Sequence, residues 1–146
     1  MKNKKGFTLI EVLIVVSIIG LLASIVLASV SAFRSRGRDT RRLADIRQIQ
    51  GALEFYYSTN GSFPPGTWAQ AKTTLEQLSG INKLSNDPSY PAKTYEYATN
   101  GSTYVLKATL DGISNPAVNG DIDGTILATI NCGSQGAGEV EYCVQP

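Results

Sequence analysis

The stretch Gly6-Phe7-Thr8-Leu9-Ile10-Glu11, with the apolar residues after it, decides the fold. It follows a short basic segment, Met1-Lys2-Asn3-Lys4-Lys5, and precedes 21 residues, 12–32, that carry no charge. At about 1.5 Å per residue, this stretch would form roughly 31 Å of α-helix, about the hydrocarbon thickness of a bilayer. The sequence therefore predicts one membrane-spanning helix near its N-terminus.

An ordinary secretory signal peptide is the main alternative for this segment. Its apolar stretch has about 7 to 15 residues and ends at a small-residue cleavage site. The stretch here is longer and continues into a charged helical pattern, which favours a membrane helix. Small residues within 27–31 keep signal cleavage open as the alternative.

Glu11 is a charge at the start of the apolar span. A charged residue costs roughly 2.5–3.5 kcal/mol at mid-membrane on insertion scales. In one interpretation Glu11 lies among the headgroups and is solvated. In the other, a peptidase cuts between Gly6 and Phe7, and the new α-amine stands four residues before Glu11. That amine could pair with Glu11 of its own chain or of a neighbour.

The segment from Gly6 to Glu11, behind a lysine-rich leader, resembles the N-terminal signature of type IV prepilins and type II secretion pseudopilins. The resemblance implies that a membrane aspartic peptidase cuts after Gly6 on the cytoplasmic side and that the Phe7 amine is methylated. It also implies that Glu11 pairs with the Phe7 amine of an adjacent subunit. The implied partners are copies of the same chain in a helical filament, the prepilin peptidase, assembly platform proteins and minor pilins.

The charges around the span disagree with the resemblance about topology. Three lysines precede the span, whereas arginines follow it at positions 34, 36, 38, 41 and 42. The positive-inside rule would then keep the C-terminal side in the cytoplasm. The resemblance and the two cysteines argue for export. We therefore expect a single-pass inner or cytoplasmic membrane protein with an extracytoplasmic head, which later joins an extracellular or periplasmic filament.

Residues 34–58 are expected to continue the same helix as an amphipathic half. Apolar residues recur there at three- and four-residue steps, and turn-forming residues follow at 60–66. The pattern predicts a leader at 1–6, a transmembrane or assembly helix at 7–33 and a second helical half at 34–58. The apolar stripe consists of Leu43, Ile46, Ile49, Leu53 and Tyr56 or Tyr57.

The stretch 34–47 is rich in arginine, which could indicate a phosphate or DNA contact. Asp39 and Asp45 interleave with the arginines, and no aromatic residue lies among them to stack on bases. We therefore expect a solvated, salt-bridged helix face with headgroup contacts, and we do not expect nucleic acid as a partner.

Residues 59–146 predict a small α+β head. A short helix is expected at Trp68–Leu78, with Gly80 as its C-cap. Asn100-Gly101 predicts a two-residue turn between strands 93–99 and 102–110, whose tyrosines should pack in the core. A third strand is expected at 125–130. The fold class is α+β and pilin-like: a long N-terminal helix on a small antiparallel sheet.

Cys132 and Cys143 are the only cysteines. An even cysteine count in an exported chain indicates a disulfide, here closing a glycine-rich loop. Two free thiols are the alternative. A C-terminal disulfide loop is also similar to that of type IVa pilins.

Asn119, Asp121 and Asp123 match the opening half of a calcium loop, with Gly124 after them. The closing position would be Ile130, which cannot bind calcium, so a polar turn is the alternative. Glu139, Glu141 or backbone carbonyls could close the shell. The resemblance adds support, because calcium binds in the head of type II pseudopilins. We expect no other cofactor.

Composition narrows the function. Without histidine the chain cannot build a Ser-His-Asp triad, a Cys-His dyad or a histidine-ligated zinc site. Removing Lys2, Lys4 and Lys5 leaves 13 − 3 = 10 basic against 12 acidic residues. We therefore expect no enzyme. The resemblance of the N-terminal segment implies a structural subunit that polymerises through its N-terminal helix into a type IV pilus or a type II secretion-like pseudopilus.

Two alternatives stay open. One is a monomeric membrane-anchored extracytoplasmic binding module, with calcium as a candidate ligand. The other is a tethered carboxylate enzyme such as a glycosidase, for which the scattered acidic residues show no facing pair. The sequence does not separate a pilus from a secretion pseudopilus or a DNA-uptake filament.

Overall fold

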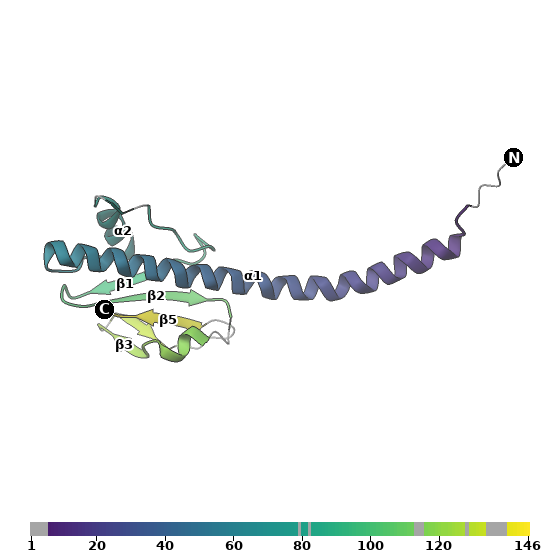
Figure 1. The fold of residues 1–146 in the computed structure, drawn as a ribbon. Helices are drawn as coiled ribbons and strands as arrows, with labels where there is room; N and C mark the ends of the chain where they lie inside the picture. The colour runs from purple at the N-terminus through teal and green to yellow at the C-terminus, as the bar shows by residue number, and fades with distance from the viewer. Residues whose placement is uncertain (1–5, 79, 82, 113–115, 128, 134–139) are drawn as a thin grey trace. The chain divides into compact units, whose positions relative to one another are not determined.

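The computed structural model describes residues 6–78, 80–81, 83–112, 116–127, 129–133 and 140–146. The chain divides into two compact units, Met1–Arg34 and Ser35–Pro146. Helix α1, Leu9–Asn60, belongs to both, so its two halves are described separately. The second unit holds the rest of the secondary structure, and the chain has the α+β fold that the sequence predicts (Figure 1).

The long helix begins and ends two residues later than the predicted 7–58. It begins at Leu9 because Thr8 caps it. At its other end Gly61 adopts a φ of +71°, and its N–H donates to the Tyr57 carbonyl at 2.8 Å. A glycine in the left-handed region is the usual way to end a helix, since it carries no Cβ to clash.

The main sheet has three antiparallel strands in the order β1-β2-β5: Glu96–Thr99, Tyr104–Leu110 and Val140–Val144. Thr99 pairs with Tyr104, so residues 100–103 form the loop, and the predicted two-residue turn is wrong. The Asn100 side chain explains the longer loop. Its Oδ1 accepts hydrogen bonds from the N–H groups of Ser102 and Thr103, at 3.0 and 2.9 Å.

The predicted third strand at 125–130 is also wrong. Those residues contribute to two short strands, β3 Gly124–Ile126 and β4 Ile130–Cys132, which pair with each other. The third strand of the main sheet is β5, near the C-terminus, which the sequence analysis missed. The paired residues of its partner β2 lie 30 to 38 positions earlier (Leu110 with Val140, Leu106 with Val144), so no local turn signal marks the pairing.

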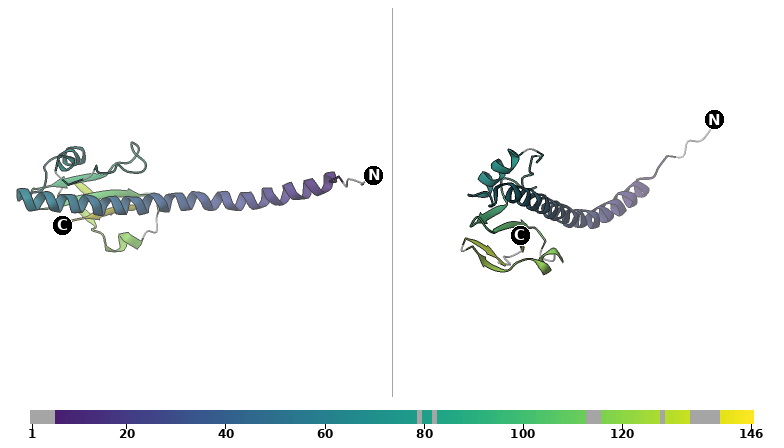
Figure 2. Two further views of the ribbon diagram at one scale, coloured as in Figure 1. Left: turned by 45° about the horizontal axis from the view of Figure 1, so that its top comes forward. Right: turned by 60° about the vertical axis from the view of Figure 1, so that its left-hand side comes forward.

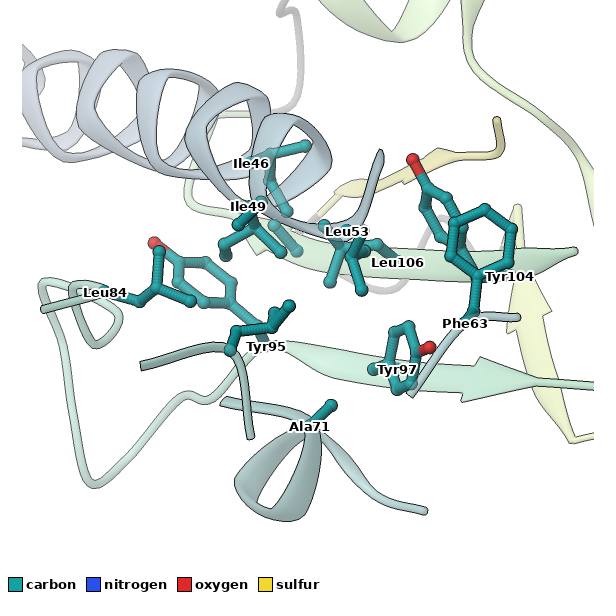
Figure 3. Close-up of a cluster of buried hydrophobic side chains, with 13 residues drawn as sticks. Ile46, Ile49, Leu53, Phe63, Ala71, Leu84, Tyr95, Tyr97, Tyr104 and Leu106 are labelled. Carbon is teal, nitrogen blue, oxygen red and sulfur yellow. The ribbon is translucent and has the colours of Figure 1, made fainter. Parts of the chain in front are cut away.

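The main core lies between the second half of α1 and one face of the sheet (Figure 3). Ile46, Ile49 and Leu53 of α1 are at most 1% exposed, which confirms the predicted stripe, although Tyr57 is 38% exposed. They pack against buried side chains from the hairpin and from helix α2, Trp68–Glu76. These are Tyr95, Tyr97, Tyr104, Leu106, Ala71 and Leu75.

Helix α2 is shorter than predicted. It ends at Glu76 with Gln77 as its C-cap, so Gly80 does not cap it. At its start the Thr67 N–H donates to Oε1 of Gln70 at 2.9 Å, one half of a capping box.

A second, smaller core covers the opposite face of the sheet. Val105 of β2 and Cys143 of β5 pack there against Ile130 and Cys132 of β4. The second unit therefore has three layers: the helical layer, the three-stranded sheet and the β3–β4 hairpin (Figure 2). The 3-10 helix η1, Pro116–Gly120, precedes the hairpin.

Candidate assembly site

The N-terminal end of α1 carries the predicted processing and assembly residues. Gly6, Phe7 and Thr8 are not helical, and Phe7 is 89% exposed. The carboxylate of Glu11 turns back to Thr8: its Oε2 accepts hydrogen bonds from the Thr8 N–H at 2.8 Å and from the Thr8 hydroxyl at 2.7 Å. The Glu11 N–H donates to the same hydroxyl at 3.3 Å. Thr8 and Glu11 thus form a reciprocal capping box.

Thr8 is the residue that the sequence analysis missed. The Thr-x-x-Glu spacing before an apolar run was the available signal. The structure brings Glu11 together with Thr8. The pairing of Glu11 with the Phe7 amine of a cleaved chain remains a prediction. The cap uses only Oε2 of Glu11. The other carboxylate oxygen, Oε1, makes no hydrogen bond within the described residues, so it is available to a cation.

The helical part of the first unit is apolar and exposed. Large aliphatic side chains between Leu9 and Val30 are between 36% and 82% exposed. The only hydroxyls at mid-span that the structure describes are satisfied internally: Ser17 donates to the Leu13 carbonyl and Ser24 to the Leu21 carbonyl. By length and composition, this is a helix that could cross a membrane. So large an exposed apolar surface indicates a membrane or protein contact.

The disulfide is formed between Cys132 and Cys143, as predicted. It joins β4 to β5, so it ties the β3–β4 hairpin to the main sheet. Both cysteines are at most 1% exposed. The loop residues 134–139, including the candidate ligand Glu139, lie outside the described residues.

The candidate calcium segment lies beside β5. Asn119 is in η1, Oδ2 of Asp121 accepts a hydrogen bond from the Cys143 N–H at 3.3 Å, and Asp123 is exposed. Burial, and then the charge of Asp123, raise the pKa of Asp121. The described residues contain no cluster of three or more acidic, cysteine or histidine side chains that could hold a metal. Glu141 is engaged by Lys107 at 3.0 Å, so the described residues give the predicted calcium site no support.

The arginine-rich stretch differs from the predicted solvated face. Arg42 is fully buried and donates to Asp87 at 2.8 and 3.1 Å and to Asp39 at 2.7 Å. It also lies 3.2 Å from Asp111, which accepts from Arg38 and Lys93 at 2.6 Å each. Three cations thus balance three carboxylates. We call these six residues the Arg42 cluster: Arg38, Asp39, Arg42, Asp87, Lys93 and Asp111.

The Arg42 cluster joins three parts of the second unit: α1, the loop after α2 and the end of β2. Asp39 also accepts hydrogen bonds from the N–H groups of Asp111 and Gly112, at 2.8 and 3.0 Å. No buried side-chain nitrogen or oxygen among the described residues lacks a partner. This full satisfaction is what a buried charged cluster requires to be tolerated.

A groove of about 800 Å³ lies between α2 and β1. Its walls include Trp68 and Lys72 of α2, Glu96 of β1, and Tyr90 and Ile130. The size is within the range of ligand pockets. It is the concave surface that a binding module would use, if the chain acted as one.

The chain is similar to known proteins in its N-terminal motif and over most of its length. The model of the prokaryotic N-terminal methylation motif matches residues 1–27. The type II secretion system core protein G of Aeromonas hydrophila is 29% identical over 115 residues, which cover 79% of this chain and 71% of that protein. The protein of the same name from Klebsiella pneumoniae is 26% identical over 129 residues, 84% of this chain and 83% of that one.

A type IV pilin is also similar. The type IV wide pilus major component PilA4 of Thermus thermophilus is 41% identical over 63 residues, which cover 43% of this chain and 48% of that protein. No solved structure gives a significant match.

The N-terminal motif and the α+β fold, a long apolar helix packed on a small antiparallel sheet, are similar to those of pilins and pseudopilins, which are structural subunits. The chain is similar to type II secretion core protein G over most of its length and to the type IV pilin PilA4 over a shorter part.

Proposed function

We propose that this chain is a structural subunit that polymerises through the first half of α1 into a type IV pilus or a type II secretion-like pseudopilus. The observation that carries the proposal is the exposed apolar helix, headed by a carboxylate held at its first turn. Apolar packing between such helices would drive association. Glu11, paired with the Phe7 amine of a neighbour, would set the axial register after cleavage at Gly6.

The longer similarity favours the pseudopilin side of this proposal. The matches to core protein G cover at least 71% of the two relatives described above, whereas the match to PilA4 covers 48% of that pilin. Before assembly, the subunit would sit in the membrane with its head outside the cytoplasm. Its partners would be further copies of the chain, a prepilin peptidase, assembly platform proteins and minor subunits.

The capping box allows the charge of Glu11 to be tested apart from its role at the helix start. Glu11→Gln keeps a side-chain carbonyl that can accept from Thr8, but it removes the charge. Thr8→Ala is the matched control, since it removes the capping hydroxyl and keeps the carboxylate. We expect normal membrane insertion of both variants, a strong loss of filament yield in Glu11→Gln, and near-normal yield in Thr8→Ala.

The measurement is the amount of sheared filament relative to membrane-inserted subunit. Equal filament yield from Glu11→Gln and the wild type would show that the charge of Glu11 does not set the axial register of the filament. Intact-mass spectrometry of membrane-extracted, unreduced protein tests processing in the same preparation. A chain that begins at methylated Phe7 and is two hydrogens lighter than its reduced form is expected. A chain that retains Met1 and shows no self-association would support the binding module instead.

A further inference from the structure

Helix phase divides the arginines that follow the apolar span into two sets. Arg38 and Arg42 turn inward to the Arg42 cluster. Arg34, Arg36, Arg41 and Arg47 are exposed. Arg34 belongs to the first unit, so the outward set of the second unit consists of Arg36, Arg41 and Arg47. The sequence alone does not separate these sets, because all six arginines lie within 14 consecutive residues.

The outward set forms a positive surface. The two carboxylates of the same stretch, Asp39 and Asp45, are only 2% and 7% exposed, and both face inward. Arg36 makes no ion pair with any residue that the structure describes. Arg41 lies 3.9 Å from Asp45, at the outer limit of an ion pair, and its side chain is 61% exposed. No exposed carboxylate therefore neutralises this surface between residues 35 and 48.

The spacing along the helix places two of these arginines near the end of the apolar span. At about 1.5 Å per residue, Arg36 is roughly 5 Å and Arg41 roughly 12 Å beyond Phe33. The headgroup region of a bilayer is about 5–8 Å thick on each side, and helical side chains lean toward the N-terminus. Arg41 can therefore extend back toward the headgroups, whereas Arg47, roughly 21 Å beyond Phe33, is too distant.

We propose that Arg36 and Arg41 bind the phosphate groups of anionic phospholipids and hold the unassembled subunit at the membrane surface. We call this pair the arginine collar. The inference rests on the membrane-inserted stage of the proposed function. Guanidinium groups suit this ligand because they donate two parallel hydrogen bonds to phosphate oxygens. A lipid surface is favoured over an acidic protein partner because the collar directly follows the apolar span.

The test uses the full chain, purified in a neutral detergent and titrated with phosphatidylglycerol or with phosphatidylcholine of the same acyl chains. Native mass spectrometry reports the fraction of subunit that carries each lipid. The test variant is R36Q/R41Q. The matched control is R47Q/K83Q, which removes the same two positive charges from exposed positions farther along the chain.

Wild type and control should bind phosphatidylglycerol in preference to phosphatidylcholine, and R36Q/R41Q should lose at least about fivefold of that preference. Added salt should weaken the preference, because exposed charges are screened. Equal binding of both lipids by the wild type would overturn the proposal. So would an equal loss in the two double variants, since net charge alone would then explain it.

Filament yield separates this inference from the proposed function. If the wild type formed normal filaments but showed no preference for phosphatidylglycerol, lipid binding by the arginine collar would be contradicted and the proposed function would not. If the wild type preferred phosphatidylglycerol but formed no filaments, lipid binding by the arginine collar would be supported and the proposed polymerisation would be contradicted.

Discussion

Arg42 binds both carboxylate oxygens of Asp87, 45 positions further along the chain. Its Nε donates to Oδ2 at 2.8 Å and its Nη2 to Oδ1 at 3.1 Å. Both side chains are at most 1% exposed. Arg42 lies on α1, and Asp87 lies in the loop between α2 and β1, so the contact fixes this loop to the long helix. Ser89 completes the arrangement by accepting from Nη2 at 2.9 Å.

Replacing Arg42 by methionine should destabilise the second unit strongly. The substitution keeps much of the volume but leaves three carboxylates without their central cation. Removing one partner of a buried ion pair costs about 3–5 kcal/mol, a large part of a typical unfolding free energy. Arg42→Lys should cost less, because it keeps the charge and loses the two-pronged geometry.

The measurement for Arg42→Met is urea unfolding of the full chain in mild detergent, followed by the fluorescence of Trp68, the only tryptophan. Arg47→Met is the control, since an exposed position should change the unfolding free energy by no more than about 0.5 kcal/mol. If the two variants unfolded at the same urea concentration, the Arg42 cluster would not be stabilising.

Asp111 makes the stability of the second unit sensitive to acid. Burial alone would raise the pKa of Asp111, but hydrogen bonds from Lys93, Arg38 and Arg42 outweigh it and hold the pKa well below its ordinary value. A depressed folded-state pKa stabilises the protein above the unfolded-state pKa, near 3.9. That contribution should fall as the pH drops from about 4 toward the folded-state value.

Asp111→Asn isolates this effect. The variant should be less stable than wild type at pH 7, by about 1.5–3 kcal/mol, because it loses charge-assisted hydrogen bonds. The gap should narrow below about pH 4, because the Asp111 carboxyl of the wild type then binds a proton in the unfolded chain while it stays ionised in the folded one. Urea midpoints at pH 7, 5, 4 and 3 check this. A gap that stayed constant over this range would show that Asp111 does not titrate as described.

Much of the long helix could be predicted from the sequence. The apolar stripe of Ile46, Ile49 and Leu53 follows helical periodicity, and periodicity depends only on near neighbours. The N-terminal Thr8–Glu11 cap was also readable, since both residues lie within one turn. The disulfide followed from the count of two cysteines.

The Arg42 cluster and β5 could not be predicted in the same way. Arg42 looks like any other arginine of a solvated face until Asp87 and Asp111, far away in sequence, lie against it. Likewise, β5 pairs with β2 across a sequence separation of at least 30 residues, and short strands carry little periodicity of their own. The two-residue turn predicted from Asn100-Gly101 is wrong because the Asn100 side chain accepts hydrogen bonds from the backbone of Ser102 and Thr103 and so stabilises a longer loop.

The disulfide should stabilise the β3–β4 side of the second unit. Cys132→Ser/Cys143→Ser opens a loop whose ends lie 11 residues apart. Loop-entropy estimates give a loss of roughly 3 kcal/mol for a loop of this size. Reduction of the wild type should lower the urea midpoint to a similar value and should not affect the double variant. A wild type insensitive to reductant would mean that the bridge does not constrain the unfolded chain.

The Tyr95 hydroxyl donates to Oδ2 of Asp45 at 2.8 Å, and both residues are at most 7% exposed. Burial, followed by the hydrogen bond to Asp45, raises the pKa of Tyr95 far above its ordinary value, so the phenol stays protonated and remains a donor. Arg41, at 3.9 Å from the same oxygen, is too distant to replace this donor. Tyr95→Phe should therefore destabilise the protein by about 1–3 kcal/mol, since it leaves a buried carboxylate short of a partner.

A double-mutant cycle with Asp45→Asn separates this hydrogen bond from packing. Tyr95→Phe should cost much less in the Asp45→Asn background, because a neutral amide is less costly to leave without the phenol. We expect a coupling energy of about 1.5–3 kcal/mol. Because Trp68 lies 6.0 Å from the Tyr95 ring, its fluorescence would report the substitution itself, so unfolding should be followed by far-ultraviolet circular dichroism. A coupling energy near zero would mean that solvent or Arg41 satisfies Asp45, and that Tyr95 contributes through burial alone.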